Sequence, residues 1–217
     1  VSIKLSDIVD GLHDRGMSMP LLLRFSDLLG DRIRLINESF KKAIADYSYQ
    51  NVYRGAFPIK VNQQQQAVHD VVTFGAPYHH GLEAGSKAEL IAALAYMRDP
   101  DAFLICNGYK DAEFIDLALS SLKMGLQTIL VLETTDELNL ILERAAALNI
   151  RPRIGIRVKL SSRVGGKWSE SGGERSVFGL TPSQVIDAVD CLRDANMLDC
   201  LELLHYHLGS QVPNIRE

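Results

Sequence analysis

Residues 127–138, QTILVLETTDEL, contain the pattern that decides the fold. The first six residues are almost all apolar or β-branched, as is typical of a strand that is buried on both faces. The polar turn that follows leads into a segment with helical spacing, and Thr134 with Glu137 has the spacing of a capping box. A buried strand that passes directly into a helix indicates one βα unit of a parallel sheet.

The same unit recurs along most of the chain. Strands are predicted at residues 52–61, 80–84, 103–107, 127–132, 153–158 and 200–208. Helices are predicted between them at residues 63–74, 87–98, 111–124, 135–148 and 182–196. Ser86 with Glu89 and Thr181 with Gln184 repeat the capping-box spacing. Such alternation predicts parallel strands joined by right-handed crossovers.

The first fifty residues follow a different pattern. A short amphipathic helix is expected over residues 1–18, an extended apolar segment over 20–25 and a second helix over 27–47. We therefore expect residues 1–50 to lead into the repeated units and residues 51–217 to form one partial barrel.

Two architectures share this alternation, the doubly wound sheet and the (β/α)8 barrel. No glycine-rich nucleotide motif follows the first strand, which disfavours a nucleotide-binding sheet. Polar residues end strand after strand, at the edge where barrel active sites form: Lys60, Glu83, Asn107, Glu133, Arg157 and His207. We predict an α/β fold with a (β/α)8 barrel present only in part, because six strands are found where a barrel has eight. The chain is thus expected to be an internal piece of a longer protein.

The composition excludes several classes of protein. With 217 residues, 47% hydrophobic and 23% charged, the chain is globular and not disordered. A net charge of −4 gives no basic field for nucleic acid or a membrane surface, and no apolar run approaches the ~20 residues of a membrane span. The three cysteines lack metal-ligand spacing, and no signal peptide is evident. We expect a cytoplasmic protein with neither nucleic-acid nor membrane partners.

Lys60 is the sharpest candidate for chemistry. It lies in the apolar segment 56–61, near the end of a strand predicted to be buried. Burial would lower the pKa of the ammonium group and make a nucleophilic amine available for a Schiff base. The alternative is a lysine just past the rim with its charged end in water, and Pro58 makes this strand irregular.

His205 and His207 are two residues apart on the last predicted strand, so they point to the same side of the sheet. Two roles remain open for this pair. It could bind a metal together with a carboxylate such as Glu83 or Glu202, or one histidine could act as a ring-stacking or acid–base group while the other is a core histidine.

Three further candidates each have an ordinary alternative. Glu83 could orient the lysine amine or neutralise an imine proton, or it could be a surface carboxylate. Arg157, if buried, needs an anionic partner, which is either a ligand or Glu133. Ser210 offers a hydroxyl in a turn suited to an anionic group. Residues 161–177, which include Trp168, form either a substrate-covering loop or a disordered segment.

Five ordered blocks resemble the biosynthetic arginine decarboxylases. The blocks are residues 59–64, 81–90, 106–111, 171–180 and 205–211. That family consists of pyridoxal-phosphate enzymes with the alanine-racemase-like fold and is related to ornithine decarboxylase. The resemblance implies that Lys60 binds pyridoxal phosphate as a Schiff base, that His207 stacks on its ring and that Ser210 contacts its phosphate. It also implies that Glu83 and Arg157 face the cofactor.

The resemblance further implies an activity, the decarboxylation of L-arginine to agmatine and CO2 in putrescine and spermidine biosynthesis. It implies a magnesium requirement and a homodimer or higher homo-oligomer. The family's glycine-rich phosphate loop, its Cys-Asp segment and its C-terminal β-domain do not occur in this chain. This chain alone is therefore expected to be inactive.

Other functions remain open from the residues. They are the decarboxylation of lysine or ornithine, a non-catalytic pyridoxal-phosphate-binding barrel, a Schiff-base aldolase without a cofactor, and a purely structural barrel.

Overall fold

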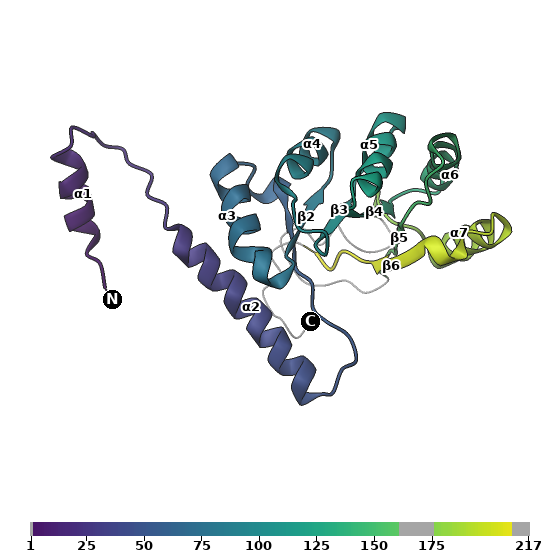
Figure 1. Cartoon of the computed structure of the whole chain (residues 1–217), viewed down its shortest axis with the longest axis horizontal. Helices are drawn as coiled ribbons and strands as arrows, with labels where there is room; N and C mark the ends of the chain where they lie inside the picture. Colours follow the sequence, from purple (N-terminus) through teal and green to yellow (C-terminus); the bar gives the residue numbers. More distant parts are fainter. Residues whose placement is uncertain (1, 161–175, 210–217) are drawn as a thin grey trace.

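A computed structural model describes residues 2–160 and 176–209 of the chain (Figure 1). Its centre is a six-stranded parallel sheet in which each strand pairs with the next one along the chain. The strands are β1 Ala56–Pro58, β2 Gly81–Ala84, β3 Phe103–Cys106, β4 Gln127–Leu132, β5 Ile154–Arg157 and β6 Leu201–His205. This sequential order is that of a barrel, since a doubly wound sheet reverses its order at a switch point. The predicted partial barrel is confirmed.

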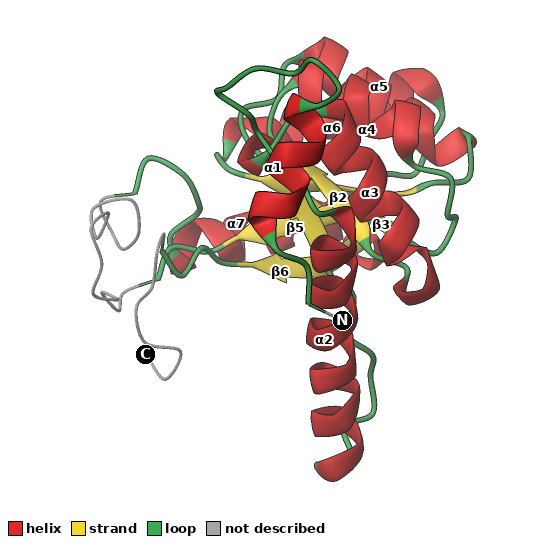
Figure 2. Cartoon of the chain, turned by 90° about the vertical axis from the view of Figure 1, so that its left-hand side faces the viewer, coloured by secondary structure: helices red, strands yellow, loops and turns green. Residues whose placement is uncertain are grey.

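Helices cover the outer face of the sheet, as Figures 1 and 2 show. They are α3 Gln65–Gly75, α4 Lys87–Tyr96, α5 Ala112–Lys123, α6 Asp136–Leu148 and α7 Pro182–Asp194. On β2 to β5, alternate strand residues point outward and are buried against these helices, among them Leu82, Leu104, Leu130 and Ile154. The other residues of each strand point inward. This period of two places one set of side chains in the core and the other set inside the barrel.

The first strand differs from its prediction. A strand was expected over residues 52–61, but β1 covers only Ala56–Pro58 and the chain continues as a 3-10 turn, η1 Ile59–Val61. Pro58 has no N–H group to donate to a neighbouring strand, which explains why the regular pairing ends there.

Of the three predicted capping boxes, the one at the start of α7 is confirmed in full. Thr181 and Gln184 form the reciprocal pair at the start of α7, with Pro182 in the first turn. Ser86 accepts from Glu89 N, but the Glu89 carboxylate bonds to Gly85 N instead of Ser86.

The capping box predicted for Thr134 and Glu137 is wrong. The helix α6 begins after Thr135, whose side chain makes no cap bond to the residues described. The Glu137 carboxylate instead accepts from the main-chain N of Glu133, one residue before the predicted cap, and from Lys110 of the preceding βα unit. Glu137 therefore bonds both to the turn before its own helix and to a residue 27 positions away.

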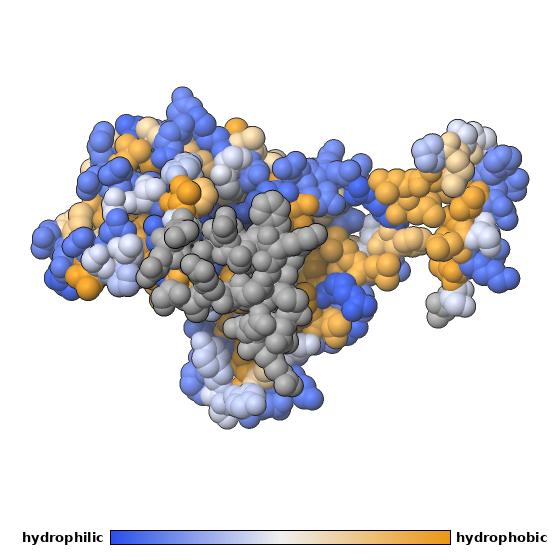
Figure 3. Space-filling view, turned by 180° about the vertical axis from the view of Figure 1, so that it is seen from behind, coloured by the Kyte–Doolittle hydropathy of each residue, from blue (hydrophilic) through white to orange (hydrophobic). Residues whose placement is uncertain are grey.

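The N-terminal part consists of α1 Leu5–His13, an extended segment and α2 Ser26–Asp46. Helix α2 packs against α3, where Gly30 leaves room for the ring of Phe74. Helix α1 lies away from the sheet, and apolar side chains gather on this arm in Figure 3. Ile3, Met19 and Leu22 are each more than 60% exposed there. In the part of the chain that the structure describes, no helix combines the length and apolar character needed to cross a membrane.

Candidate functional site

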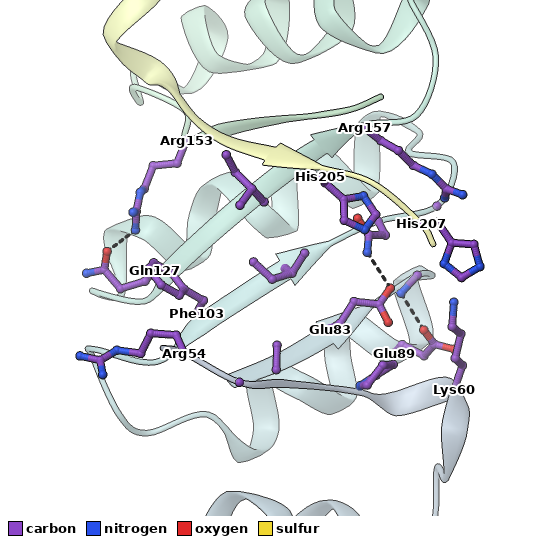
Figure 4. A pocket seen from close by; sticks show the side chains of 18 of the residues that line it. Arg54, Lys60, Glu83, Glu89, Phe103, Gln127, Arg153, Arg157, His205 and His207 are labelled. Atoms are coloured by element: carbon purple, nitrogen blue, oxygen red, sulfur yellow. Dashed lines mark hydrogen bonds between the residues drawn. The ribbon is translucent and has the colours of Figure 1, made fainter. Parts of the chain in front are cut away.

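The inner face of the sheet borders a cavity of about 1200 Å³ (Figure 4). Inward residues of all six strands or of the segments that follow them line it. Four predicted site residues meet there, and these are Lys60, Glu83, Arg157 and His207. Ser210 lies outside the described residues, as do residues 161–175 with Trp168.

Lys60 lies in η1, one turn beyond β1, and its side chain is exposed. The burial expected for a residue within a strand is therefore not found, because the strand ends at Pro58. Figure 4 shows the amine directed into the same end of the cavity as His207 and Glu83. Of the two interpretations, the structure favours a lysine at the rim, with its amine facing the cavity.

Glu83 is buried on β2, with 6% of its surface exposed. The amide of Asn107 donates to Glu83 Oε1 at 3.1 Å, whereas Oε2 has no partner among the described residues. Burial raises the pKa of the Glu83 carboxyl above its ordinary value, while Lys60 and the Asn107 bond oppose this shift. Glu83 is therefore not a surface carboxylate.

His205 and His207 both line the cavity, which confirms that they share one side of the sheet. Burial is the main cause that lowers the pKa of both imidazoles, and the charge of Arg157 adds to it. Both rings are therefore neutral at neutral pH. The Nδ1 atom of His205 is buried and has no partner within the described chain. His205 is thus a polar residue aimed into the cavity and not a satisfied core histidine.

Arg157 lies on β5 directly beside His205 in the parallel register. Its NH1 group donates to Glu133 Oε2 at 3.0 Å and to Oε1 at 3.3 Å. The guanidinium also lies over the ring of Phe178, 5.5 Å from its centre. Glu133 is thus the anionic partner of Arg157, and the arginine still borders the cavity.

A metal site built from the two histidines is not supported. Glu202 pairs with Arg153 and does not line the cavity with His205 and His207. Among the residues that the structure describes, the potential metal ligands that gather in one place are His79, Asp99 and Asp101. They precede β2 and β3 and thus lie at the opposite end of the strands from Lys60.

The arrangement at the carboxyl ends of the strands fits a carbonyl ligand that carries an aromatic ring. Lys60 supplies a primary amine, and His207 supplies a neutral ring beside it. Three of the buried side-chain atoms that lack partners in the described chain lie at this site, namely Glu83 Oε2, Asn107 Oδ1 and His205 Nδ1. Buried polar atoms in native proteins are almost always paired, so a polar ligand or water is required at this place.

Comparison with known proteins identifies related sequences and folds. A family model described as "Pyridoxal-dependent decarboxylase, pyridoxal binding domain" matches residues 33–217. The chain is 49% identical to the biosynthetic arginine decarboxylase of Nostoc sp. over 214 residues, which are 99% of this chain and 32% of that protein.

Two solved structures resemble this fold. The biosynthetic arginine decarboxylase SpeA of Campylobacter jejuni superposes with a TM-score of 0.84 and 37% identity, over 95% of this chain and 33% of that one. Diaminopimelate decarboxylase of Helicobacter pylori shares the fold, with a TM-score of 0.64 and 22% identity over 85% of this chain and 44% of that one. The chain spans about a third of the length of the curated relatives it matches.

Proposed function

Because this chain belongs to the family of pyridoxal-dependent decarboxylases, through their pyridoxal binding domain, we propose that it supplies the cofactor-binding part of an arginine decarboxylase. The reaction converts L-arginine to agmatine and CO2, for use in polyamine synthesis. The support for this substrate is the similarity to proteins named biosynthetic arginine decarboxylase over nearly the whole chain. The observation that carries the chemistry is the Lys60 amine in one cavity with Glu83, Arg157 and His207.

When bound, pyridoxal phosphate supplies an aldehyde that reacts with primary amines and a ring that accepts the electrons of a broken C–C bond. Lys60 holds the cofactor covalently through its side-chain nitrogen. His207 packs its neutral imidazole against the cofactor ring and fixes the plane of that ring. Ser210 donates its hydroxyl to the phosphate group. These three roles rest on the family resemblance together with the shared cavity wall of Lys60 and His207.

Glu83 provides a hydrogen-bond donor in this proposal. Burial favours its neutral form, and because Asn107 donates to Oε1, the neutral carboxyl would carry its proton on Oε2. That oxygen has no partner in the described part of the chain. A carboxylic acid in this state donates to an acceptor atom of the ligand. Arg157 presents the N–H groups that Glu133 does not occupy to an anionic oxygen of the ligand.

Product analysis of the complete enzyme tests the function. The enzyme is incubated with pyridoxal phosphate and L-arginine, L-lysine or L-ornithine in turn, and the amine product is identified by mass. Agmatine from arginine is expected, and Lys60→Ala should abolish its formation. Putrescine from ornithine or cadaverine from lysine, without agmatine, would contradict the proposed substrate.

The proposal extends to a homodimer or higher homo-oligomer in the cytoplasm and to a magnesium requirement. The family resemblance supports the oligomer and the magnesium requirement, and the three cysteines without metal-ligand spacing favour the cytoplasm. The described residues at the carboxyl ends of the strands do not form a magnesium ligand set, because the potential metal ligands gather at the other end. No step of the reaction is therefore assigned to magnesium.

A further inference from the structure

A buried ion pair lies directly behind the cofactor end of the cavity. Lys110 follows β3, and Glu137 lies in the first turn of α6. The Lys110 side chain is 0% exposed and that of Glu137 is 5% exposed, with 3.3 Å between Nζ and Oε2. Lysine is among the residues least often buried completely. A lysine in this position therefore calls for a specific reason.

The Glu137 carboxylate ties together two loops of the rim. Its Oε1 accepts from the main-chain N of Lys110 at 3.1 Å, and its Oε2 accepts from the main-chain N of Glu133 at 2.8 Å. The Lys110 ammonium donates in addition to Gly108 O at 2.7 Å. The pair thus fixes the main chain at the ends of both β3 and β4.

Glu133 is held at several points and in turn holds Arg157. Its Oε1 accepts from Gly108 N at 3.1 Å, and its main-chain oxygen accepts from Gly179 N at 2.9 Å. The carboxylate is 2% exposed and binds the Arg157 guanidinium with both oxygens. Of the charged side chains in this network, those of Arg157 and Glu133 border the cavity.

The charges of the network balance. Lys110 and Arg157 contribute two positive charges, and Glu137 and Glu133 contribute two negative ones. Burial lowers the pKa of the Lys110 ammonium, and the two glutamates oppose this shift. Removal of one partner from a buried pair leaves an uncompensated charge, which is more costly than the loss of the contact.

We propose that Glu133 is a positioning residue that aims the Arg157 guanidinium at the bound cofactor, and that the buried Lys110–Glu137 pair holds Glu133 in place for this purpose. The inference rests on the proposed function, in which Arg157 faces pyridoxal phosphate. Glu133 is bonded on one side to the loops that follow β3 and β4, and on the other side to the long side chain of Arg157. The Arg157 side chain can rotate about several single bonds, and its hydrogen bond to Glu133 restricts this rotation before the ligand binds. Less conformational entropy is then lost on binding.

A double-mutant cycle on the complete enzyme tests the proposal. The dissociation constant of pyridoxal phosphate is measured from the absorbance of the bound cofactor for the wild type, Glu133→Gln, Arg157→Gln and the double variant. Glu133→Gln should weaken binding at least about tenfold, as for the loss of a hydrogen bond to a charged group. In the Arg157→Gln background the same change should weaken binding less than about twofold, because the effect acts through Arg157. An equal loss in both backgrounds would show that Glu133 acts only on general structure and would overturn the proposal.

The variant Glu137→Gln repeats the test at the buried pair, and it replaces Glu133→Gln if that protein does not fold. It should also weaken cofactor binding in the wild-type background and not in the Arg157→Gln background. Unchanged binding in folded Glu137→Gln would overturn the part assigned to the pair.

Asp116→Asn is the matched control. Asp116 pairs with Arg144 between α5 and α6, in the same two βα units but on their outer side. This change should leave the dissociation constant as it is in both backgrounds. The proposed function is checked separately on the wild type. If reduction traps no cofactor on Lys60, the function fails, whereas a trapped adduct with additive effects in the cycle contradicts only the role of Glu133.

Discussion

The side-chain amide of Asn107 donates to Glu83 Oε1 and leaves Glu83 Oε2 buried without a partner in the described chain. The two residues come from neighbouring strands, β2 and the end of β3, so the backbone pairing fixes their separation. Asn107 therefore satisfies one of the two carboxyl oxygens. The arrangement therefore reserves one carboxyl oxygen for a ligand at the place where the Lys60 amine enters the cavity.

The raised pKa of Glu83 predicts a pH-dependent stability. Because the folded protein binds this proton more tightly than the unfolded chain does, the stabilisation is present at low pH and is lost as pH rises through the folded pKa. Glu83→Gln removes this titration. The variant should gain in thermal stability relative to the wild type as pH is raised from 5 to 7.5, without added cofactor. A constant difference across this range would show that Glu83 is ionised throughout.

The outward residues of the sheet should carry the stability of the fold. Leu104 on β3 is fully buried, so Leu104→Ala should lower the free energy of unfolding by about 2–5 kcal/mol. Ile91 on α4 is 58% exposed, and Ile91→Ala should change it by less than about 0.5 kcal/mol. Urea titration of the two variants measures both values. Similar losses at the two positions would contradict the assigned core.

Gly108 should be intolerant of a side chain. Its φ is +72°, and a Cβ atom would lie 2.3 Å from Gly85 O. Gly108→Ala should therefore destabilise the protein by more than about 1 kcal/mol and weaken cofactor binding. Gly125 also has a positive φ, +86°, but nothing lies within 4 Å of its Cβ position. Gly125→Ala isolates the backbone cost, and an equal loss at the two glycines would rule out the clash.

The observed capping of α6 and α7 predicts opposite results for two threonines. Thr181 caps α7 through its side chain, so Thr181→Ala should cost about 1 kcal/mol. Thr135 precedes α6 without a side-chain cap bond in the described structure, so Thr135→Ala should cost close to nothing. Thermal unfolding of both variants measures the difference. A larger loss at Thr135 would mean that α6 is capped in another way.

The sequence predicts the architecture well because the barrel consists of local units. The bounds of β4 match the prediction at both ends, since an apolar run with a polar turn after it needs no distant information. The rule that the carboxyl ends of parallel strands meet at one edge also places Lys60, Glu83, Arg157 and His207 in one cavity, as observed. Local patterns leave open whether Lys60 is buried in the strand or lies at the rim, and the structure favours the rim because β1 ends at Pro58.

Distant contacts decide the remaining details of the site. Glu137 has the spacing of a cap residue, yet Lys110 binds it from 27 positions away. The sequence analysis did not single out Lys110. The available signal was its position two residues after Gly108, at the end of a predicted strand. The choice between Glu133 and a ligand as partner of Arg157 likewise depends on where two loops meet in space.

Covalent trapping is the measurement that tests the account most directly. The complete enzyme is mixed with pyridoxal phosphate, reduced with borohydride, digested and mapped by mass spectrometry. The account predicts the reduced cofactor on the nitrogen of Lys60, and no adduct in the pocket of Lys60→Ala. An adduct on a different residue of the wild type, or the absence of any adduct, would contradict the central claim.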